Sequence, residues 1–133
     1  MKITRAGDYA LNVMVYIGSQ EKNKLFMRNE LSEICGIPDS FLGKILQSLA
    51  REGILYSERG KKGGFKLLRD PSEITLYEII KAVEGDIKIN DCLVDSNFCA
   101  GLSNCNIHSV LNKIRDSFIE ELKKYTLENI IKG

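Results

Sequence analysis

The stretch from residue 28 to residue 68 most constrains the fold, because its patterns predict two short helices followed by two short strands. The first helix is expected over residues 28–35 and ends at Gly36. The second is expected over residues 39–52, where Pro38 suits the first turn. Its apolar stripe has helical spacing and consists of Leu42, Ile45, Leu46 and Leu49. Two helices joined by the tight turn "CGIPD" predict a helix-turn-helix.

A hairpin is expected directly after this helix pair. Residues 54–58 and 65–68 have the composition of strands, and the glycine-bounded sequence "RGKKGG" lies between them. A helix-turn-helix followed by a hairpin with a basic tip is the pattern of a winged helix. The sequence therefore predicts a mainly α fold with a small β-hairpin, to which a long C-terminal helix is added.

Further helices are expected on both sides of this unit. Apolar positions with helical spacing predict one over residues 6–18. Thr75 and Glu78 form a T-x-x-E capping box that opens another helix, which Gly85 ends. No sustained periodicity follows until about Asn106, where an apolar stripe predicts the long final helix. We therefore expect three parts: a winged-helix domain over residues 1–84, a cysteine-rich loop over 85–105, and a C-terminal helix with a tail over 106–133.

Positive charge is concentrated between Lys44 and Arg69. This segment contains seven basic residues and two acidic ones, although the whole chain has a net charge of +1. Lys and Arg at a hairpin tip can neutralise phosphates, and an arginine at its base suits a narrow minor groove. A solvated basic turn would explain the hairpin alone, but the combined pattern favours binding to double-stranded DNA. The residues expected to contact DNA are Ser40, Lys44, Gln47, Arg51, Arg59, Lys61 and Lys62.

Three of the four cysteines, and the only histidine, lie in the stretch "CLVDSNFCAGLSNCNIH". Its cysteines are Cys92, Cys99 and Cys105, and His108 follows three positions later. Small polar neighbours argue against a packed core, and the gaps are wider than those of most structural zinc sites. Thiolates select zinc, copper(I) or an iron–sulfur cluster, so the stretch predicts a metal or cluster site. Cys35, at a predicted helix end, is expected to be a small packed residue.

The start of the chain does not resemble a signal peptide, and no apolar run approaches the roughly 18 residues of a membrane span. We therefore expect a cytoplasmic protein without a membrane partner. In that compartment, grouped cysteines serve more often as metal ligands or redox groups than as structural disulfides.

The sequence resembles the bacterial winged-helix regulators typified by the iron–sulfur cluster regulator IscR and the nitric-oxide-sensitive repressor NsrR. The resemblance covers nearly the whole chain. It rests on "MKITRAGDYALNVM", on "CGIPDSFLGKILQSLAREGILYSERGKKGGFKL", and on the three-cysteine loop before a long helix. It implies a transcriptional regulator that forms a homodimer through the C-terminal helix and senses cluster status, redox state or nitric oxide.

The resemblance also implies roles for individual residues. Cys92, Cys99 and Cys105 match the family's ligands of a 2Fe–2S or 4Fe–4S cluster. His108 matches the fourth ligand of IscR-like members, whereas Asp8 matches a ligand that some NsrR-like members supply from the other subunit. Arg59 matches the arginine that enters the minor groove, and Ser40 and Lys44 lie where members contact DNA. Gly43 replaces a glutamate that helps IscR discriminate between sites.

Two other classes of function compete with a cluster-controlled regulator. A winged-helix regulator could use the cysteine loop to bind zinc or as a thiol redox switch. A thiol oxidoreductase is disfavoured, since the chain has no C-x-x-C motif in a βαβ context and the basic hairpin would have no role. We therefore expect a protein that is not an enzyme.

Overall fold

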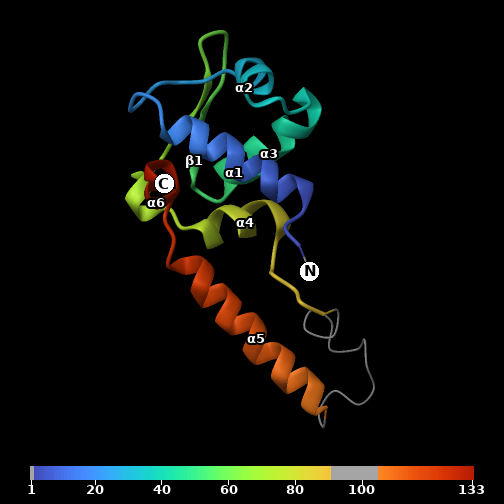
Figure 1. The fold of residues 1–133 in the computed structure, drawn as a ribbon. Coiled ribbons are helices and arrows are strands. Elements are labelled where there is room, and N and C mark those ends of the chain that lie inside the picture. The colour runs from blue at the N-terminus through green and yellow to red at the C-terminus, as the bar shows by residue number, and fades with distance from the viewer. Residues whose placement is uncertain (1, 91–104) are drawn as a thin grey trace.

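The computed structural model describes residues 2–90 and 105–133 (Figure 1). Helices dominate, and the strands form one antiparallel hairpin, so the predicted mainly α fold with a small hairpin is confirmed. The elements in chain order are α1 (Arg5–Gly18), α2 (Arg28–Cys35), α3 (Asp39–Arg51), β1 (Leu55–Glu58), β2 (Gly64–Leu67), the 3-10 helix η1 (Pro71–Glu73), α4 (Leu76–Glu84), α5 (Asn106–Lys123) and α6 (Leu127–Lys132).

Local capping sets several of these boundaries. The Thr4 hydroxyl accepts a hydrogen bond from the Gly7 N–H at 3.2 Å and so begins α1. The predicted capping box at α4 forms, since the Thr75 hydroxyl accepts from Glu78 N while the Glu78 carboxylate accepts from Thr75 N. In the turn between α2 and α3, Gly36 adopts φ 66°, a left-handed conformation that ends α2.

The core lies between α1, α3 and α4 (Figure 1), whose apolar faces meet. The predicted stripe of α3 is buried in full. In α1 the buried apolar side chains are Ala10, Val13, Met14 and Ile17, whereas Tyr9 is half-buried. In α2, Leu31 is fully buried, whereas Ile34 is 53% exposed. The main core side chains are Val13, Met14, Phe26, Leu31, Leu42, Leu46, Leu49, Ile54, Ile74, Ile79 and Leu127.

The hairpin is attached to this core at its base. Leu55 pairs with Leu67, and Glu58 with Gly64. The backbones of Phe26 and Phe65 exchange hydrogen bonds of 2.8 and 2.9 Å, so the segment before α2 adds a short third strand. The hairpin is the wing of the winged helix. At its base, β2 pairs with β1 on one side and with the segment before α2 on the other, while the tip of the wing projects from the body.

The C-terminal part differs from the predicted helix and tail. Helix α5 extends away from the body, and α6 then returns to pack beside α1 (Figure 1). Thr126 opens α6 with a capping box to Asn129, and Leu127 is fully buried. Residues 127–132 therefore form a packed helix, because the chain turns at Lys124 and places a new apolar side chain in the core.

Candidate DNA interface and cysteine site

The outer face of α3 carries the four polar residues predicted to contact DNA. Ser40, Lys44, Gln47 and Arg51 are all exposed and recur at helical spacing. They take this position because the opposite stripe of the helix is buried against α1 and α4. The structure therefore brings these four side chains together on one accessible helix face.

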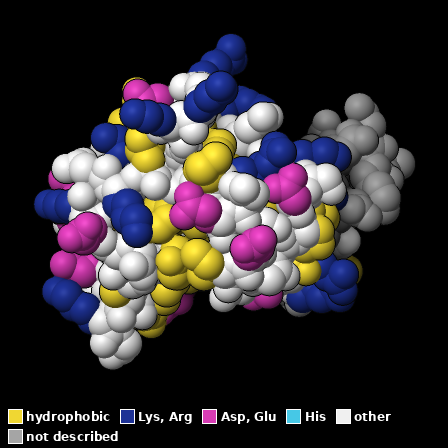
Figure 2. All heavy atoms as spheres, turned by 90° about the horizontal axis from the view of Figure 1, so that it is seen from above, with side chains coloured by type: hydrophobic (Ala, Val, Ile, Leu, Met, Phe, Trp, Pro, Cys, Tyr) yellow, Lys and Arg dark blue, Asp and Glu magenta, His cyan; other side chains and the backbone are white. Residues whose placement is uncertain are grey.

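The tip of the wing carries the other three predicted contacts, Arg59, Lys61 and Lys62, and all are exposed. Its tight turn depends on glycine: Gly60 has φ 105°, and Gly63 N donates to the Gly60 carbonyl at 3.1 Å. A β-carbon at Gly63 would overlap the carbonyl of Glu58. Figure 2 shows the molecule from above Figure 1. Lys and Arg side chains are spread over the face seen there, and acidic side chains lie among them.

A groove separates α3 from the wing. Gly43 and Gln47 line its helix side, and Ser57, Gly60 and Gly63 line its wing side. A recognition helix in the major groove and a wing in the adjacent minor groove would lie on the two sides of such a groove. The arrangement of α3, groove and wing is therefore suited to one side of a DNA duplex.

Arg28 also lines this groove, although the sequence patterns did not predict it to contact DNA. Its Nε donates to Asp39 Oδ1 at 3.1 Å, and its Nη2 lies 3.1 Å from Asp39 Oδ2. The two residues come from different helices, α2 and α3. The only sequence signal was a cation at a predicted helix start, where the helix dipole disfavours positive charge.

Arg69, counted within the basic segment, does not belong to the exposed interface. Its guanidinium donates to both carboxylate oxygens of Glu78 at 2.9 Å, and about a third of each side chain is exposed. The pair joins the end of the hairpin to α4. This cation therefore has a structural partner within the chain, unlike the cations at the wing tip.

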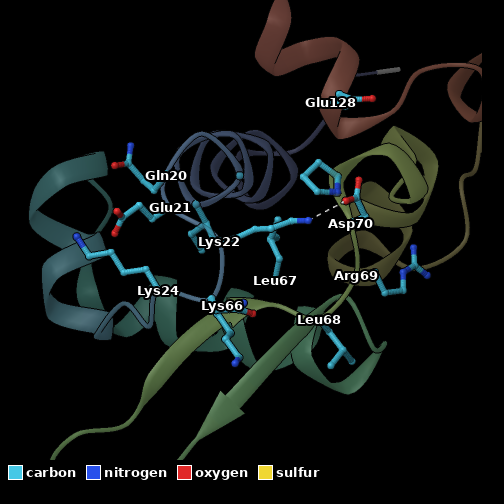
Figure 3. Close-up of a pocket in the computed structure, with 14 residues that line it drawn as sticks. Gln20, Glu21, Lys22, Lys24, Lys66, Leu67, Leu68, Arg69, Asp70 and Glu128 are labelled. Carbon is cyan, nitrogen blue, oxygen red and sulfur yellow. Dashed lines mark ion pairs between the residues drawn. The ribbon is translucent and has the colours of Figure 1, made fainter.

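A separate cavity of about 440 Å³ lies between the end of α1 and the segment from β2 to η1 (Figure 3). Lys22 reaches across it toward Asp70, with 3.6 Å between Nζ and Oδ2. Lys24, Lys66 and Arg69 point in different directions. Because these cations do not converge, the cavity lacks the geometry of an anion site.

The described part of the cysteine stretch is its last turn. Cys105 is the N-cap of α5, and its Sγ accepts from His108 N at 3.5 Å. Both residues are half-buried, and His108 Nδ1 is a buried atom with no hydrogen-bond partner among residues 2–90 and 105–133. A helix start favours negative charge, which suits a thiolate ligand. The two side chains thus fit one edge of a metal or cluster site; Cys92 and Cys99 lie outside the described residues.

Asp8 and Cys35 lie on other elements. Asp8 is exposed in the first turn of α1, where the helix dipole favours an acid. Cys35 is half-buried, and burial raises the pKa of its thiol, in agreement with its predicted packing role. Within residues 2–90 and 105–133, no three His, Cys, Asp or Glu side chains form a group able to hold a metal ion. No helix in that part of the chain is long and apolar enough to cross a membrane.

Comparisons with known proteins agree with this architecture. The Rrf2 family, described as iron-dependent transcriptional regulators, matches residues 3–133. Protein aau3 of Rhizobium meliloti is 32% identical over all of this chain and 86% of its own length. The regulator NsrR of Bacillus subtilis is 29% identical over all of this chain and 92% of its own length.

Solved structures share the fold. T. potens IscR superposes with a TM-score of 0.76 at 24% identity, covering 99% of this chain and 87% of that one. The oxidized form of Staphylococcus aureus CymR gives 0.75 at 25% identity, covering 100% and 98%. These likenesses confirm the predicted winged helix. The family and its NsrR relatives are transcriptional regulators and not enzymes. The chain belongs to the Rrf2 family of transcriptional regulators.

Proposed function

We propose that this regulator binds operator DNA as a homodimer and that an iron–sulfur cluster controls the binding. Cys92, Cys99 and Cys105 would hold the cluster, with a fourth ligand from His108 or from Asp8 of a second subunit. The observation that carries the proposal is the pair formed by Cys105 and His108 on the first turn of α5. There the Cys105 thiol accepts a hydrogen bond from the backbone N–H of His108, whose imidazole Nδ1 is buried without a partner in the described chain.

Chemical fit supports a cluster in this position. Thiolates are the main ligands of iron–sulfur clusters, and histidine is an attested substitute. A buried polar atom without a hydrogen bond costs free energy, and a ligand bond to His108 Nδ1 would remove that cost. When bound, the cluster supplies a centre that responds to oxidants and to nitric oxide. His108 and Asp8 stand as alternative fourth ligands, which determine whether one subunit or two complete the site.

The connections of the loop support control of DNA binding. The loop begins where α4 ends, and α4 packs against both α1 and the recognition helix α3. The carboxylate Oε1 of Glu84, the last residue of α4, accepts from Thr4 N at 2.7 Å and from the Thr4 hydroxyl at 2.6 Å. A change at the loop would therefore reach the start of α1 and the packing of α3. Two recognition helices must fit successive major grooves, so small shifts between subunits alter affinity.

The exposed face of α5 supports dimerisation. Ile107, Val110, Ile114 and Phe118 are 68%, 55%, 48% and 46% exposed, and they follow helical spacing along a helix that projects from the body. Four large apolar side chains in one stripe are typical of a surface that a partner covers. Pairing of two α5 helices would bury this stripe and place the two winged helices on the same side of a duplex.

The cofactor is tested by anaerobic purification followed by an absorption spectrum and by iron, sulfide and zinc analysis. We expect a coloured protein with iron and acid-labile sulfide, and loss of both in Cys105→Ser. Comparison of His108→Ala with Asp8→Ala assigns the fourth ligand by cluster retention. Cys35→Ser is the matched control, because this half-buried thiol lies on α2 and should not affect the cluster.

The main alternative is a zinc site or a thiol redox switch in the same loop, which the likeness to the oxidized form of CymR favours. The same preparation separates the two proposals. A colourless protein with stoichiometric zinc, or one without metal whose DNA affinity follows thiol oxidation, would exclude the cluster.

DNA binding through the wing is tested with Arg59→Ala. Loss of a cation that enters the minor groove should weaken operator binding and reduce its dependence on salt concentration. Lys22→Ala is the control, since Lys22 is an exposed cation on the cavity side of the hairpin base. Unchanged affinity and salt dependence in Arg59→Ala would contradict the assignment of the wing.

A further inference from the structure

We propose that Arg28, held over Gly43 by Asp39, contacts a guanine in the operator and is a specificity-determining residue. The inference rests on the proposed binding of DNA through α3 and the wing. It identifies a base contact supplied by α2, the first helix of the helix-turn-helix, at a position where the recognition helix has no side chain.

The packing of Arg28 on Gly43 places it on the recognition face. Gly43 lies between Ser40 and Gln47 with spacing i, i+3, i+7, so the three positions share one side of α3. A β-carbon at Gly43 would lie 3.2 Å from Arg28 Nη1 and 3.3 Å from Arg28 Cδ. The arginine side chain therefore occupies the space that a longer residue at position 43 would fill.

The pairing with Asp39 fixes the guanidinium and leaves its outer edge available. Asp39 engages Nε and Nη2 of Arg28 at 3.1 Å each, which is a side-on pair. A guanidinium has five N–H donors, so both hydrogens of Nη1 and one of Nη2 remain. Nη1 and Nη2 together match O6 and N7 of guanine, the commonest specific contact in the major groove.

The charges in the groove favour a base edge over a phosphate. The carboxylate of Asp39 already balances Arg28, and Glu58 also lines the groove. A phosphate here would meet two carboxylates and one cation, whereas a guanine edge is uncharged. The side chains of Arg28 and Asp39 are 51% and 49% exposed, so the pair is accessible to a duplex without rearrangement of the core.

The test is selection from a pool of random-sequence duplexes by the full-length protein, followed by sequencing and by titration of the selected duplex at several salt concentrations. The variants are Arg28→Ala, Arg28→Lys and Asp39→Asn. Lys22→Ala is the control, because it removes another exposed cation paired with an aspartate on a different element. Thermal unfolding of each variant verifies that it is folded.

The wild-type protein and Lys22→Ala are expected to select a guanine at one position of each half-site. Arg28→Ala should lose that preference, keep the rest of the motif, and bind the wild-type site about 5- to 150-fold more weakly with an unchanged salt slope. Arg28→Lys keeps the positive charge but lacks the planar guanidinium that donates two parallel hydrogen bonds. This variant should therefore also lose the preference for guanine. Asp39→Asn should weaken the preference and strengthen binding to unselected DNA.

Three results would overturn the inference. Selection of the same motif by Arg28→Ala would show that Arg28 contacts no base. A uniform loss of affinity with a salt slope lower by about one would show a phosphate contact. Failure of the wild-type protein to enrich any motif would instead refute the proposed DNA-binding function itself, and the inference with it.

Discussion

Replacement of Gly7 by alanine should destabilise this protein, although glycine is a poor helix former. Gly7 is buried in the first turn of α1, directly beneath the Glu84 carboxylate that binds Thr4. A β-carbon at this position would overlap Glu84 Oε1 and lie 2.7 Å from Ile3 Cγ2. Ile3 is exposed and can move away, but Glu84 can move only by leaving Thr4.

The expected magnitude follows from two opposing terms. Alanine in place of glycine favours a helix by about 0.5–1 kcal/mol. Displacement of Glu84 removes two hydrogen bonds to Thr4, each worth about 0.5–1.5 kcal/mol at an accessible position. The free energy of unfolding of Gly7→Ala should therefore fall by about 1 kcal/mol, and by at most about 2.5 kcal/mol.

A double-mutant cycle with Glu84→Ala isolates the cause. Urea unfolding followed by circular dichroism, at one fixed protein concentration, gives the four free energies. Without the Glu84 carboxylate, Gly7→Ala should be neutral or stabilising, with a coupling of about 1–3 kcal/mol. An equal cost in both backgrounds, or stabilisation of the wild-type chain by Gly7→Ala, would refute the reasoning.

Three further predictions concern other parts of the fold. Leu127→Ala should lower the free energy of unfolding by about 2–5 kcal/mol in the same urea assay, because the side chain is fully buried; an exposed tail would lose almost nothing. Gly64→Ala places a β-carbon 2.5 Å from the Phe26 carbonyl, so the hairpin base should detach and its amides should exchange faster, as hydrogen exchange would record. Hydrogen bonds from Ser72 lower the pKa of Asp70, so its contribution to stability should be complete above the ordinary aspartate pKa and be lost as pH falls through the lower folded value. Urea midpoints of Asp70→Asn and wild type should accordingly converge in acid, and a constant difference between them would contradict this.

Local sequence patterns anticipated most of the winged helix. The stripe of α3, the capping box at Thr75 and the glycine-bounded wing tip depend on spacings of a few residues, which the sequence displays directly. The same kind of signal, T-x-x-N at Thr126, marks the start of α6, in a segment that was predicted to be a tail. The apolar stripe of α5 had continued to Tyr125, past the point where the chain turns.

Contacts between distant segments required the tertiary structure. Leu127 enters the same core as α1, more than a hundred positions earlier, through backbone hydrogen bonds that join the starts of α4 and α6. Arg69 and Arg28 illustrate the same limit for charge. Neither partner follows from the neighbouring residues, since the fold turns Arg69 toward Glu78 and sets Arg28 over Gly43.

The sequence by itself determined the winged-helix class and the exposed faces of α3 and the wing. Periodicity, caps and turn residues act between neighbours in the chain, so they are visible without a fold. The tertiary structure alone decided that Arg69 pairs with Glu78, that Arg28 packs over Gly43, and that Glu84 joins α4 to α1. These contacts depend on how the packed helices are placed relative to one another, which side-chain spacing along one element does not encode.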